Sequence, residues 1–415
     1  MRVWILRLPL SRFALQGPLR MTLFCTENTM IDFEYYNPAK IIFGEHSEQK
    51  LKSLLAAHGV KSLQLVYSGD FIKTLGIYDV IKDAVAELGI RFSENGNVVP
   101  NPSIDLVREL VKQGKQNQVD FVLAVGGGSS IDTAKAVALG IPYEGDVWDF
   151  FERGISPEKV LPIGVIATTA SSGSETSNAA ILSSGQWKLG FEDDRIIPKF
   201  AIMNPKYTVG LPAYQTFVGI ADVLSHLLER YFSDEKFSDT TDYLIEGAIR
   251  ALLVNADKLI ANQKDVNARG EIQWLASVAH GGFLDAGRRA DWGSHRIEHE
   301  LSAQYNITHG EGMAVVTVAW TKYMAKKKPW RLALLASRLF GVDTFNYSET
   351  ERAYILSEKL AAFFKKLHLA TNLAELKIDD RDFDSMAARA TRNGKVGHYV
   401  PLDAAAIKDI LKIAL

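Results

Sequence analysis

The sequence predicts an α/β protein in two parts, an N-terminal domain built on a parallel sheet and an all-α C-terminal domain. Two observations favour this fold class. Short apolar runs alternate with helical patterns up to about residue 205, whereas only longer helical patterns follow. A chain of 415 residues also exceeds the size at which one hydrophobic core stops growing. We therefore expect two folded domains, residues 30–210 and residues 211–415.

The predicted sheet rests on four continuous apolar runs, which suit strands that are buried on both faces. They are Ser62–Tyr67, Phe121–Val125, Leu161–Ala167 and Phe200–Met203. Between these runs, apolar residues recur at a spacing of three to four, which predicts covering helices. The helices expected there are Glu48–Ala57, Ile77–Leu88, Ile104–Lys115 and Ile131–Leu139.

The second half of the chain shows the helical spacing over longer stretches, and no strand pattern competes with it. These stretches are Thr240–Ala261, Glu271–Leu284, Trp330–Phe340 and Glu349–Leu367. Residues 211–415 are therefore expected to form a helical domain.

Residues 1–29 differ from the rest of the chain, because they carry four arginines and no acid before Glu27. This composition resembles a mitochondrial presequence, but it also fits a start codon assigned too early, with Met30 as the true start. We favour a misassigned start or a dispensable, disordered extension.

Composition and charge narrow the classes of function. The net charge of −2 gives no basic excess for binding nucleic acid or an anionic membrane. No apolar run approaches the ~20 residues needed to span a bilayer, so we expect a cytoplasmic protein without a membrane segment. Cys25 is the only cysteine, which excludes disulfides within the chain and cysteine-ligated metal sites. His and Asp remain as the credible metal ligands.

Histidines cluster in the helical half, where five of the nine lie between residues 226 and 309. Asp222 and His226 are four residues apart in a segment with helical spacing, so their side chains share a face. Three imidazoles and one carboxylate would hold a zinc, iron or cobalt ion. An isolated Asp–His pair is more often a surface contact. The sequence pattern leaves open which histidines belong to a site: His226, His280, His295, His299 or His309.

A glycine-rich turn, Gly126–Ser130, connects a predicted strand to a predicted helix. Glycines there let backbone amides approach a phosphate, and the helix N-terminus adds partial positive charge. A second polar turn, Thr168–Thr176, follows the strand that ends at Ala167. Ligands of open parallel sheets bind beyond such strand ends. Either turn alone would often be structural, but the pair favours a shared nucleotide site.

Four motifs together resemble the iron-containing, group III alcohol dehydrogenases, and most closely the NADPH-dependent butanol dehydrogenase branch. They are Gly126–Lys135 (GGGSSIDTAK), Ser171–Thr176 (SSGSET), Gly219–His226 (GIADVLSH) and Asp291–Gly310. The branch also has counterparts of Trp148–Phe151 (WDFF) and His299–Ala303 (HELSA). The similarity runs in unbroken order from about Phe33 to the C-terminus. It implies a dehydroquinate synthase-like architecture, in which a Rossmann-like nucleotide domain and a helical domain enclose the active site.

The resemblance also implies which residues form that site. It assigns the metal, Fe²⁺ or Zn²⁺, to Asp222, His226, His295 and His309. It leaves His299 off the metal, and we expect this residue to be the catalytic proton relay. It assigns the nucleotide to Asn101, Gly127, Gly128, Ser129, Asp132, Thr168, Thr169, Ser174 and Lys188. It further implies a homodimer that acts on small alcohols and aldehydes such as butanol and butanal.

The choice of cofactor depends on Gly69 and Asp70, at the end of an early strand. NAD-dependent members of the family carry aspartate at the position that matches Gly69, and glycine there leaves space for the 2′-phosphate of NADP. Asp70 and Phe71 depart from NADP-dependent relatives, which tend to have glycine and serine. We expect NADP, with NAD as the alternative.

Two other functions stay open. Dehydroquinate synthase, a lyase of the same superfamily, would bring several Lys and Arg residues to a phosphorylated substrate, and Arg288, Arg289 and Arg296 lie in the relevant segment. A non-catalytic metal-binding protein is the second alternative. His280 stands where relatives usually have Asn, and we expect it to pack beside the ligands rather than bind the metal.

Overall fold

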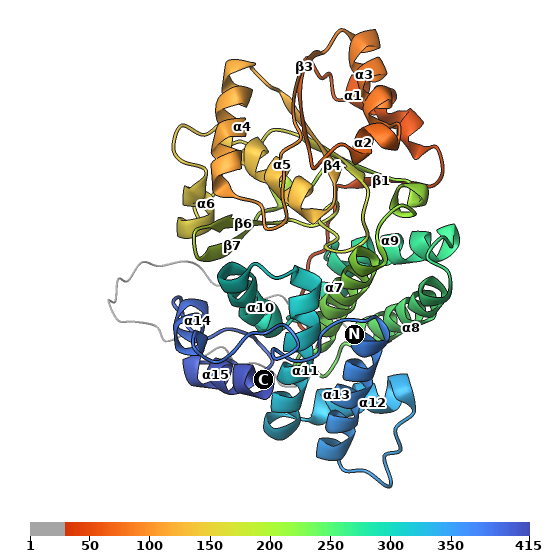
Figure 1. Ribbon diagram of the computed structural model, residues 1–415, viewed down its shortest axis with the longest axis vertical. Helices are drawn as coiled ribbons and strands as arrows, with labels where there is room; N and C mark the ends of the chain where they lie inside the picture. The colour runs from red at the N-terminus through yellow and green to blue at the C-terminus, as the bar shows by residue number, and fades with distance from the viewer. Residues whose placement is uncertain (1–29) are drawn as a thin grey trace, which may run out of the picture.

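Figure 1 shows the computed structural model, which describes residues 30–415. The upper part holds a sheet with helices on both faces, and the lower part is all helical. The fold class predicted from the sequence is confirmed. Residues 1–29, for which we expected an extension or a misassigned start, lie outside the described residues.

Six parallel strands form the main sheet, in the spatial order β1-β8-β5-β4-β2-β3. Their bounds are β1 Lys40–Phe43, β2 Ser62–Tyr67, β3 Arg91–Asn95, β4 Phe121–Gly126, β5 Ile163–Ala167 and β8 Phe200–Met203. The four inner strands are buried at every residue, which explains their continuous apolar runs. The edge strands β1 and β3 are partly exposed and carry charged residues, so no apolar run marks them in the sequence.

Helices cover both faces of this sheet, because side chains along each strand alternate between two cores. One core lies under α1 (Leu51–Ala57), α2 (Phe71–Thr74) and α3 (Ile77–Leu88). The other lies under α4 (Ile104–Gln116), α5 (Gly128–Gly140) and α6 (Trp148–Arg153). Leu65 of β2 belongs to the first core and its neighbour Val66 belongs to the second.

The order of the strands reverses beside β2. The chain runs outward from β2 to β3 and then crosses back to β4, on the opposite side of β2. Ligands of such sheets bind beyond the carboxyl ends of the strands at this switch point. The turns that follow β2 and β4 lie together there, since a Cβ placed on Gly126 would be 3.7 Å from Ser68 Oγ.

An antiparallel hairpin extends from the sheet domain and contacts α10 of the helical domain. It consists of β6 (Ala179–Ser184) and β7 (Trp187–Glu192). This hairpin was not predicted from the sequence, because β6 (AAILSS) contains only two large apolar residues and has only scattered buried positions. The hairpin carries Lys188 to the boundary between the two domains.

The helical domain packs around α7 and α11, which are buried along most of their length. Its helices are α7 Ala213–Tyr231, α8 Asp239–Ala261, α9 Val266–His280, α10 Gly293–Tyr305, α11 His309–Lys327, α12 Trp330–Phe340, α13 Glu349–Lys366, α14 Phe383–Ala390 and α15 Ala404–Ile413. Short 3₁₀ turns occupy Ser47–Lys50, Asp194–Ile196, Pro205–Thr208 and Phe283–Asp285. Among the helices of residues 30–415, none combines the length and the apolar content needed to cross a membrane.

The predicted helix that differs most from the structure is the one that corresponds to α9. The sequence pattern predicted a helix over Glu271–Leu284, but α9 ends at His280. Gly282 then adopts φ +82°, a left-handed conformation that stops the helix, and the apolar Leu284 is buried on a separate 3₁₀ turn. This early end places His280 at a helix terminus beside the site described next.

Candidate active site

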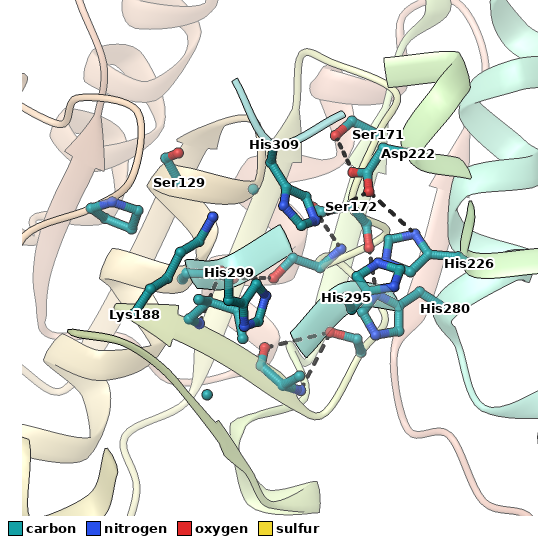
Figure 2. Close-up of a pocket in the computed structure, with 18 of the residues that line it drawn as sticks. Ser129, Ser171, Ser172, Lys188, Asp222, His226, His280, His295, His299 and His309 are labelled. Carbon is teal, nitrogen blue, oxygen red and sulfur yellow. Dashed lines mark hydrogen bonds and ion pairs between the residues drawn. The ribbon is translucent and has the colours of Figure 1, made fainter. Parts of the chain in front are cut away.

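A cavity of about 230 Å³ lies between the sheet domain and the helical domain. Figure 2 shows Ser129 and Lys188 on one side of it and the histidine cluster on the other. The predicted site residues that line it are Asn101, Gly128, Ser129, Asp132, Ser174, Lys188, Asp222, His226, His295, His299 and His309. The predicted residues that do not line it are Gly69, Asp70, Gly127, Thr168 and Thr169.

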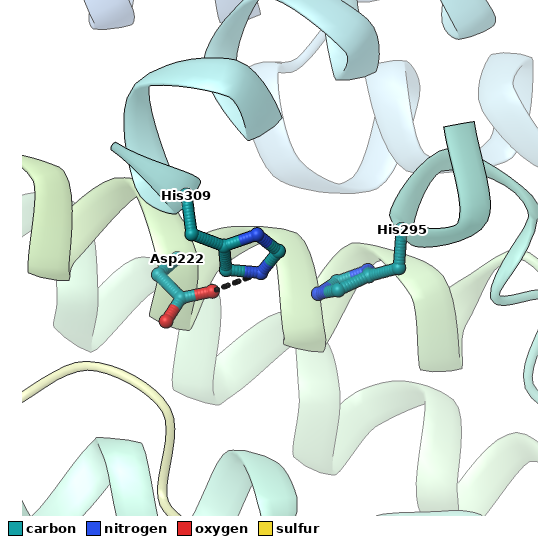
Figure 3. Close-up of side chains that lie close together, drawn as sticks. All are labelled: Asp222, His295 and His309. Carbon is teal, nitrogen blue, oxygen red and sulfur yellow. Dashed lines mark ion pairs between the residues drawn. The ribbon is translucent and has the colours of Figure 1, made fainter. Parts of the chain in front are cut away.

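Asp222, His295 and His309 converge from three helices, α7, α10 and α11. One ligand atom of each residue lies within 4.8 Å of the other two. Figure 3 shows the two rings and the carboxylate facing one space, and His309 Nε2 is 3.6 Å from Asp222 Oδ1. Ligand atoms at about 2.1 Å from one tetrahedral ion are about 3.4 Å apart, so this group is close to the required spacing.

His226 lies beside these three residues, but it is not one of the residues whose ligand atoms all lie within 4.8 Å of one another. Its Nδ1 is 3.8 Å from Asp222 Oδ1, so the spacing of four residues does place both side chains on one face of α7. Its ring packs between the rings of His280 and His295, with centroid separations of 4.4 Å and 4.8 Å. His280 Nδ1 in turn donates a 2.5 Å hydrogen bond to the backbone oxygen of Ser172, which fixes the His280 ring against His226.

The donor set fits a divalent cation. Asp222 Oδ1, His226 Nδ1 and His295 Nε2 are buried and have no hydrogen-bond partner among residues 30–415. Buried polar atoms without partners are rare, because each one costs free energy. Burial, reinforced by the neighbouring histidines and Arg230, lowers the pKa of His226 well below its usual value. Neutral imidazole is the form that binds metals.

Two buried glutamates hold the histidine rings, and neither was predicted from the sequence. Glu229 Oε1 accepts hydrogen bonds from the backbone N of His295 at 2.9 Å and from its Nδ1 at 3.0 Å. Glu298 Oε2 accepts a hydrogen bond from His309 Nδ1. Donation by Nδ1 leaves each Nε2 as a ligand atom and fixes the direction of the ring. The spacing of Glu229, three residues after His226 on one helix, was the available signal.

His299 lies one helical turn beyond His295, and its ring centroid is 5.7 Å from that of His309. Its Nδ1 is buried without a hydrogen-bond partner in the described part of the chain. Burial lowers the pKa of His299 well below its usual value, and the charges of Lys188, His309 and Arg296 act in the same direction. A neutral imidazole in this place can accept a proton.

The turn after β4 forms the wall of the cavity on the side of the sheet domain. Gly127 caps α5 and Gly128 begins it. A Cβ on Gly128 would lie 2.6 Å from Ser172 Oγ, and one on Gly127 would lie 2.4 Å from Thr169 Oγ1. Glycine therefore lets the two polar turns approach closely, and the backbone amides at the start of α5 border the cavity, where they suit a phosphate.

Asp132 and Ser174 line the cavity, but their oxygens already bond to the protein. Asp132 Oδ1 accepts a 2.6 Å hydrogen bond from Ser174 Oγ, and its Oδ2 accepts one of 3.1 Å from the backbone N of Ile181. Lys135 Nζ donates a 3.0 Å bond to Ser174 Oγ. Burial raises the pKa of Asp132 and lowers the pKa of Lys135 to about 8. These bonds join α5 to the strand β6.

The other predicted nucleotide residues lie at the ends of neighbouring strands and loops. Thr168 is buried just after β5, and its hydroxyl has no partner among the described residues. Asn101 adopts φ +54° and donates a 2.9 Å hydrogen bond to Asn306 Oδ1, which links the two domains at the mouth of the cavity. Lys188 Nζ lies 3.7 Å from Glu298 Oε2, beside the proposed metal ligands.

The turn after β2 holds Gly69 and Asp70, which were predicted from the sequence to influence cofactor choice. Gly69 has φ +68°, and a Cβ there would meet only the ring of Phe71, at 3.9 Å. The side chain of Asp70 is exposed, and Lys73 Nζ lies 2.7 Å from its carboxylate. The space around Gly69 is therefore open to a larger group, and the positive charge of Lys73 partly offsets the negative charge of Asp70.

Two family models match the chain in sequence. The model described as iron-containing alcohol dehydrogenase matches residues 38–205. The model described as the C-terminal part of the Fe-containing alcohol dehydrogenase family matches residues 216–415. Together they cover the sheet domain and the helical domain.

Individual proteins are similar over nearly the same length. The probable NADH-dependent butanol dehydrogenase 1 of Bacillus subtilis is 34% identical over 388 residues, which cover 93% of this chain and 100% of the relative. The NADPH-dependent aldehyde reductase of Escherichia coli is 28% identical over 384 residues, 90% of this chain and 97% of the relative. The crystal structure of NADH-dependent butanol dehydrogenase A from Thermotoga maritima is similar with a TM-score of 0.89 and 34% identity, over 93% of this chain and 99% of that one.

Proposed function

Because the chain belongs to the iron-containing alcohol dehydrogenase family and is an NAD(P)-dependent alcohol dehydrogenase and aldehyde reductase, we propose a role for each of its two domains. Residues 211–415 hold one divalent metal ion through Asp222, His226, His295 and His309. Residues 30–210 bind the nucleotide. The substrates are small primary alcohols and their aldehydes, of the kind of butanol and butanal.

The observation that carries this proposal is the convergence of two sites on one cavity. Asp222, His295 and His309 meet on the helical wall, and the helix terminus at Gly128 forms part of the opposite wall. A cation and part of a nucleotide bound there would share a space of about 230 Å³. Such a space holds two reactants close together.

When bound, the cation would polarise the substrate oxygen and the nicotinamide would accept or give the hydride. Oxidation of an alcohol removes a hydride from its carbon and a proton from its oxygen, and reduction of an aldehyde adds both. His299 lines both this cavity and a second cavity beside it, so we assign it the transfer of that proton. Glu229 and Glu298 keep the rings of His295 and His309 in place.

We propose NADP as the preferred nucleotide. The open position at Gly69 and the pairing of Asp70 with Lys73 support it, because both reduce the obstacle to a 2′-phosphate. The relatives point both ways: the relative from Bacillus subtilis is named NADH-dependent, and the reductase from Escherichia coli is named NADPH-dependent. Turnover measured with NADPH and with NADH at equal concentrations decides between them.

Several further features belong to the same proposal. Three imidazoles and a carboxylate suit both Fe²⁺ and Zn²⁺, with iron favoured by the family. A homodimer in the cytoplasm is our expectation, which light scattering of the purified protein and cell fractionation would test. The matched proteins named above are dehydrogenases and a reductase, so they give no support to a lyase or to a non-catalytic metal-binding protein.

The central experiment is to purify the full chain without oxygen and to measure its metal content and its activity together. We expect about one iron or zinc ion per chain, and oxidation of NAD(P)H that depends on added butanal. Chelation should abolish the activity, and the matching metal should restore it. Full turnover by protein without bound metal would contradict the proposed role of the histidine cluster.

A further inference from the structure

A second cavity of about 410 Å³ lies beside His299, on the side facing the C-terminal segment. It shares five lining residues with the first cavity, so the two spaces adjoin: Lys188, Glu192, Trp292, Arg296 and His299. Its other walls come from β7 and from the loop between α14 and α15, residues 391–403. A substrate whose reacting carbon lies near His299 could therefore extend its far end into this second cavity.

Basic side chains dominate the walls of this second cavity. Arg296 is exposed on α10, and Arg392 and Lys395 are exposed on the loop after α14. Within residues 30–415, no carboxylate oxygen lies within 4.0 Å of the charged nitrogens of these three residues. The guanidinium of Arg392 lies 4.5 Å from the ring centroid of Trp187, which holds it at the wall without neutralising it.

Most of the acidic side chains in the same walls form an ion pair or hydrogen bonds with other groups of the protein. Glu300 pairs with Arg389 at 2.7 Å, and both side chains are nearly buried. Asp291 Oδ1 accepts hydrogen bonds from the backbone N of His398 at 2.9 Å and of Tyr399 at 2.7 Å. Glu192 is the one acid in these walls for which the described residues supply no ion pair or hydrogen bond. The walls hold five basic side chains (Lys188, Arg296, Arg389, Arg392 and Lys395) against three acidic ones (Glu192, Asp291 and Glu300), so the lining has a net positive formal charge.

The nucleotide does not account for this charge. The turn that suits its phosphates, at Gly128 and Ser129, lines only the first cavity. The turn on which recognition of a 2′-phosphate depends, at Gly69, borders neither cavity. The positive charge beside His299 is therefore available to the substrate.

We propose that this second cavity binds a carboxylate at the far end of the substrate, so that the enzyme prefers aldehydes with a terminal carboxylate to uncharged aldehydes of equal length. This inference rests on the proposed function, since it places the aldehyde group at the same metal site. Arg296 is the specificity-determining residue, because it lines both cavities and carries a planar guanidinium that matches a carboxylate. Arg392 and Lys395 add charge at the outer wall.

Matched pairs of aldehydes test the proposal on the metal-loaded enzyme. Butanal and 4-oxobutanoate have the same number of carbons and differ in the terminal carboxylate, as do pentanal and 5-oxopentanoate. We expect kcat/KM to be about tenfold to hundredfold higher for the charged member of at least one pair, the size of one charged hydrogen bond. Added salt should raise KM for the charged aldehyde and leave KM for the uncharged one nearly constant.

Variants then locate the effect. Arg296→Ala should lower the ratio of kcat/KM between charged and uncharged aldehydes by about tenfold or more, and Arg296→Lys should restore part of it. Arg392→Ala provides a second test should Arg296→Ala fold poorly. Arg153→Ala is the matched control, because Arg153 is an exposed arginine on α6 that lines neither cavity, and it should leave the ratio unchanged.

The outcomes separate this inference from the proposed function. In both pairs, a kcat/KM for the uncharged aldehyde that equals or exceeds the value for its charged partner would overturn the inference. The proposed dehydrogenase function would then still stand. An unchanged ratio in both Arg296→Ala and Arg392→Ala would also overturn it. Failure to reduce any aldehyde with metal and either nucleotide present would contradict the proposed function itself.

Discussion

His309 Nδ1 donates a hydrogen bond to the carboxylate of Glu298, a side chain with no exposed surface. The opposite nitrogen of the same ring lies 3.6 Å from Asp222 Oδ1. Burial alone would raise the pKa of Glu298, but the charges of His309 and Lys188 outweigh it and lower the pKa to about 2. Glu298 is therefore an anion that touches a proposed metal ligand and a proposed nucleotide contact at once.

Glu298→Gln tests this link between the metal and the nucleotide. The amide keeps the size of the side chain but removes the charge, so the hydrogen bond that orients the His309 ring becomes weaker. We expect metal affinity to fall by about 10-fold to 100-fold, the usual effect of losing such a carboxylate. Metal titration followed by elemental analysis measures it. Glu300→Gln is the control on the same helix, because Glu300 pairs with Arg389 away from the ligands, and equal loss in both variants would contradict the assignment.

Substitution of His226 and of His280, one at a time, decides which of the two stacked rings binds the metal. Their centroids are 4.4 Å apart, so either substitution disturbs similar packing. We expect His226→Ala to lose most of its bound metal and its turnover, because it removes one of four proposed ligands. His280→Ala should keep its metal. Retention of full metal content by His226→Ala would remove His226 from the ligand set.

His299→Ala separates proton transfer from metal binding. The Nδ1 of His299 is buried without a partner in the described chain, so its loss disturbs few protein contacts. We expect kcat to fall by about 100-fold or more, within the usual range for loss of a general acid or base. Elemental analysis should show unchanged metal. A parallel loss of metal and activity would mean that His299 belongs to the metal centre.

Gly69→Asp tests the basis of nucleotide choice. A carboxylate there would repel the 2′-phosphate of NADP and could bind the ribose hydroxyls of NAD. We expect kcat/KM with NADPH to fall by about tenfold or more relative to NADH. Gly89→Asp is the matched control for backbone strain, since Gly89 also has positive φ and open surroundings. Equal losses of kcat/KM with both nucleotides would show that position 69 does not discriminate between NADPH and NADH.

Lys135 gives a pH-dependent contribution to stability. Burial lowers its pKa to about 8, although Asp132 and Glu175 oppose this, against about 10.4 in an unfolded chain. Between these values the unfolded state holds the proton and the folded state does not, so stability rises with pH. From pH 8 to pH 10, the free energy of unfolding should rise by about 2 kcal/mol more for the wild type than for Lys135→Met. Urea unfolding measures these free energies. An equal change for the wild type and Lys135→Met between pH 8 and pH 10 would contradict the lowered pKa of Lys135.

The central strands could be predicted from the sequence because burial on both faces demands continuous apolar residues. The bounds of β2 and β8 agree with the predicted runs, and α3 and α12 agree with the predicted helices. The edge strands β1 and β3 and the hairpin β6–β7 were missed, since partial exposure removes that demand. The family was also identified from short motifs, because each of them combines several residue types at fixed spacing, and the family models confirm it.

The residues of the site also differ in how far the sequence alone predicts their contacts. Asp222 and His226 could be paired from sequence because a helix fixes which residues share a face. Glu229 meets His295 across 66 positions of the chain, and no local period marks such a contact. Asp132 and Ser174 were predicted to bind nucleotide, which stays a prediction; the hydrogen bond between them depends on packing and could not be read from the sequence.

The sequence by itself determined the layers of the fold, the family and the residue types available for a metal and a nucleotide. These features depend on composition and on spacing along one element, which the chain carries before it folds. The tertiary structure decided which side chains meet: His309 meets Glu298, His226 meets His280, and Arg296 lines a cavity in which no described carboxylate pairs with it. Such contacts depend on how α7, α10 and α11 pack, and packing is a property of the whole buried core.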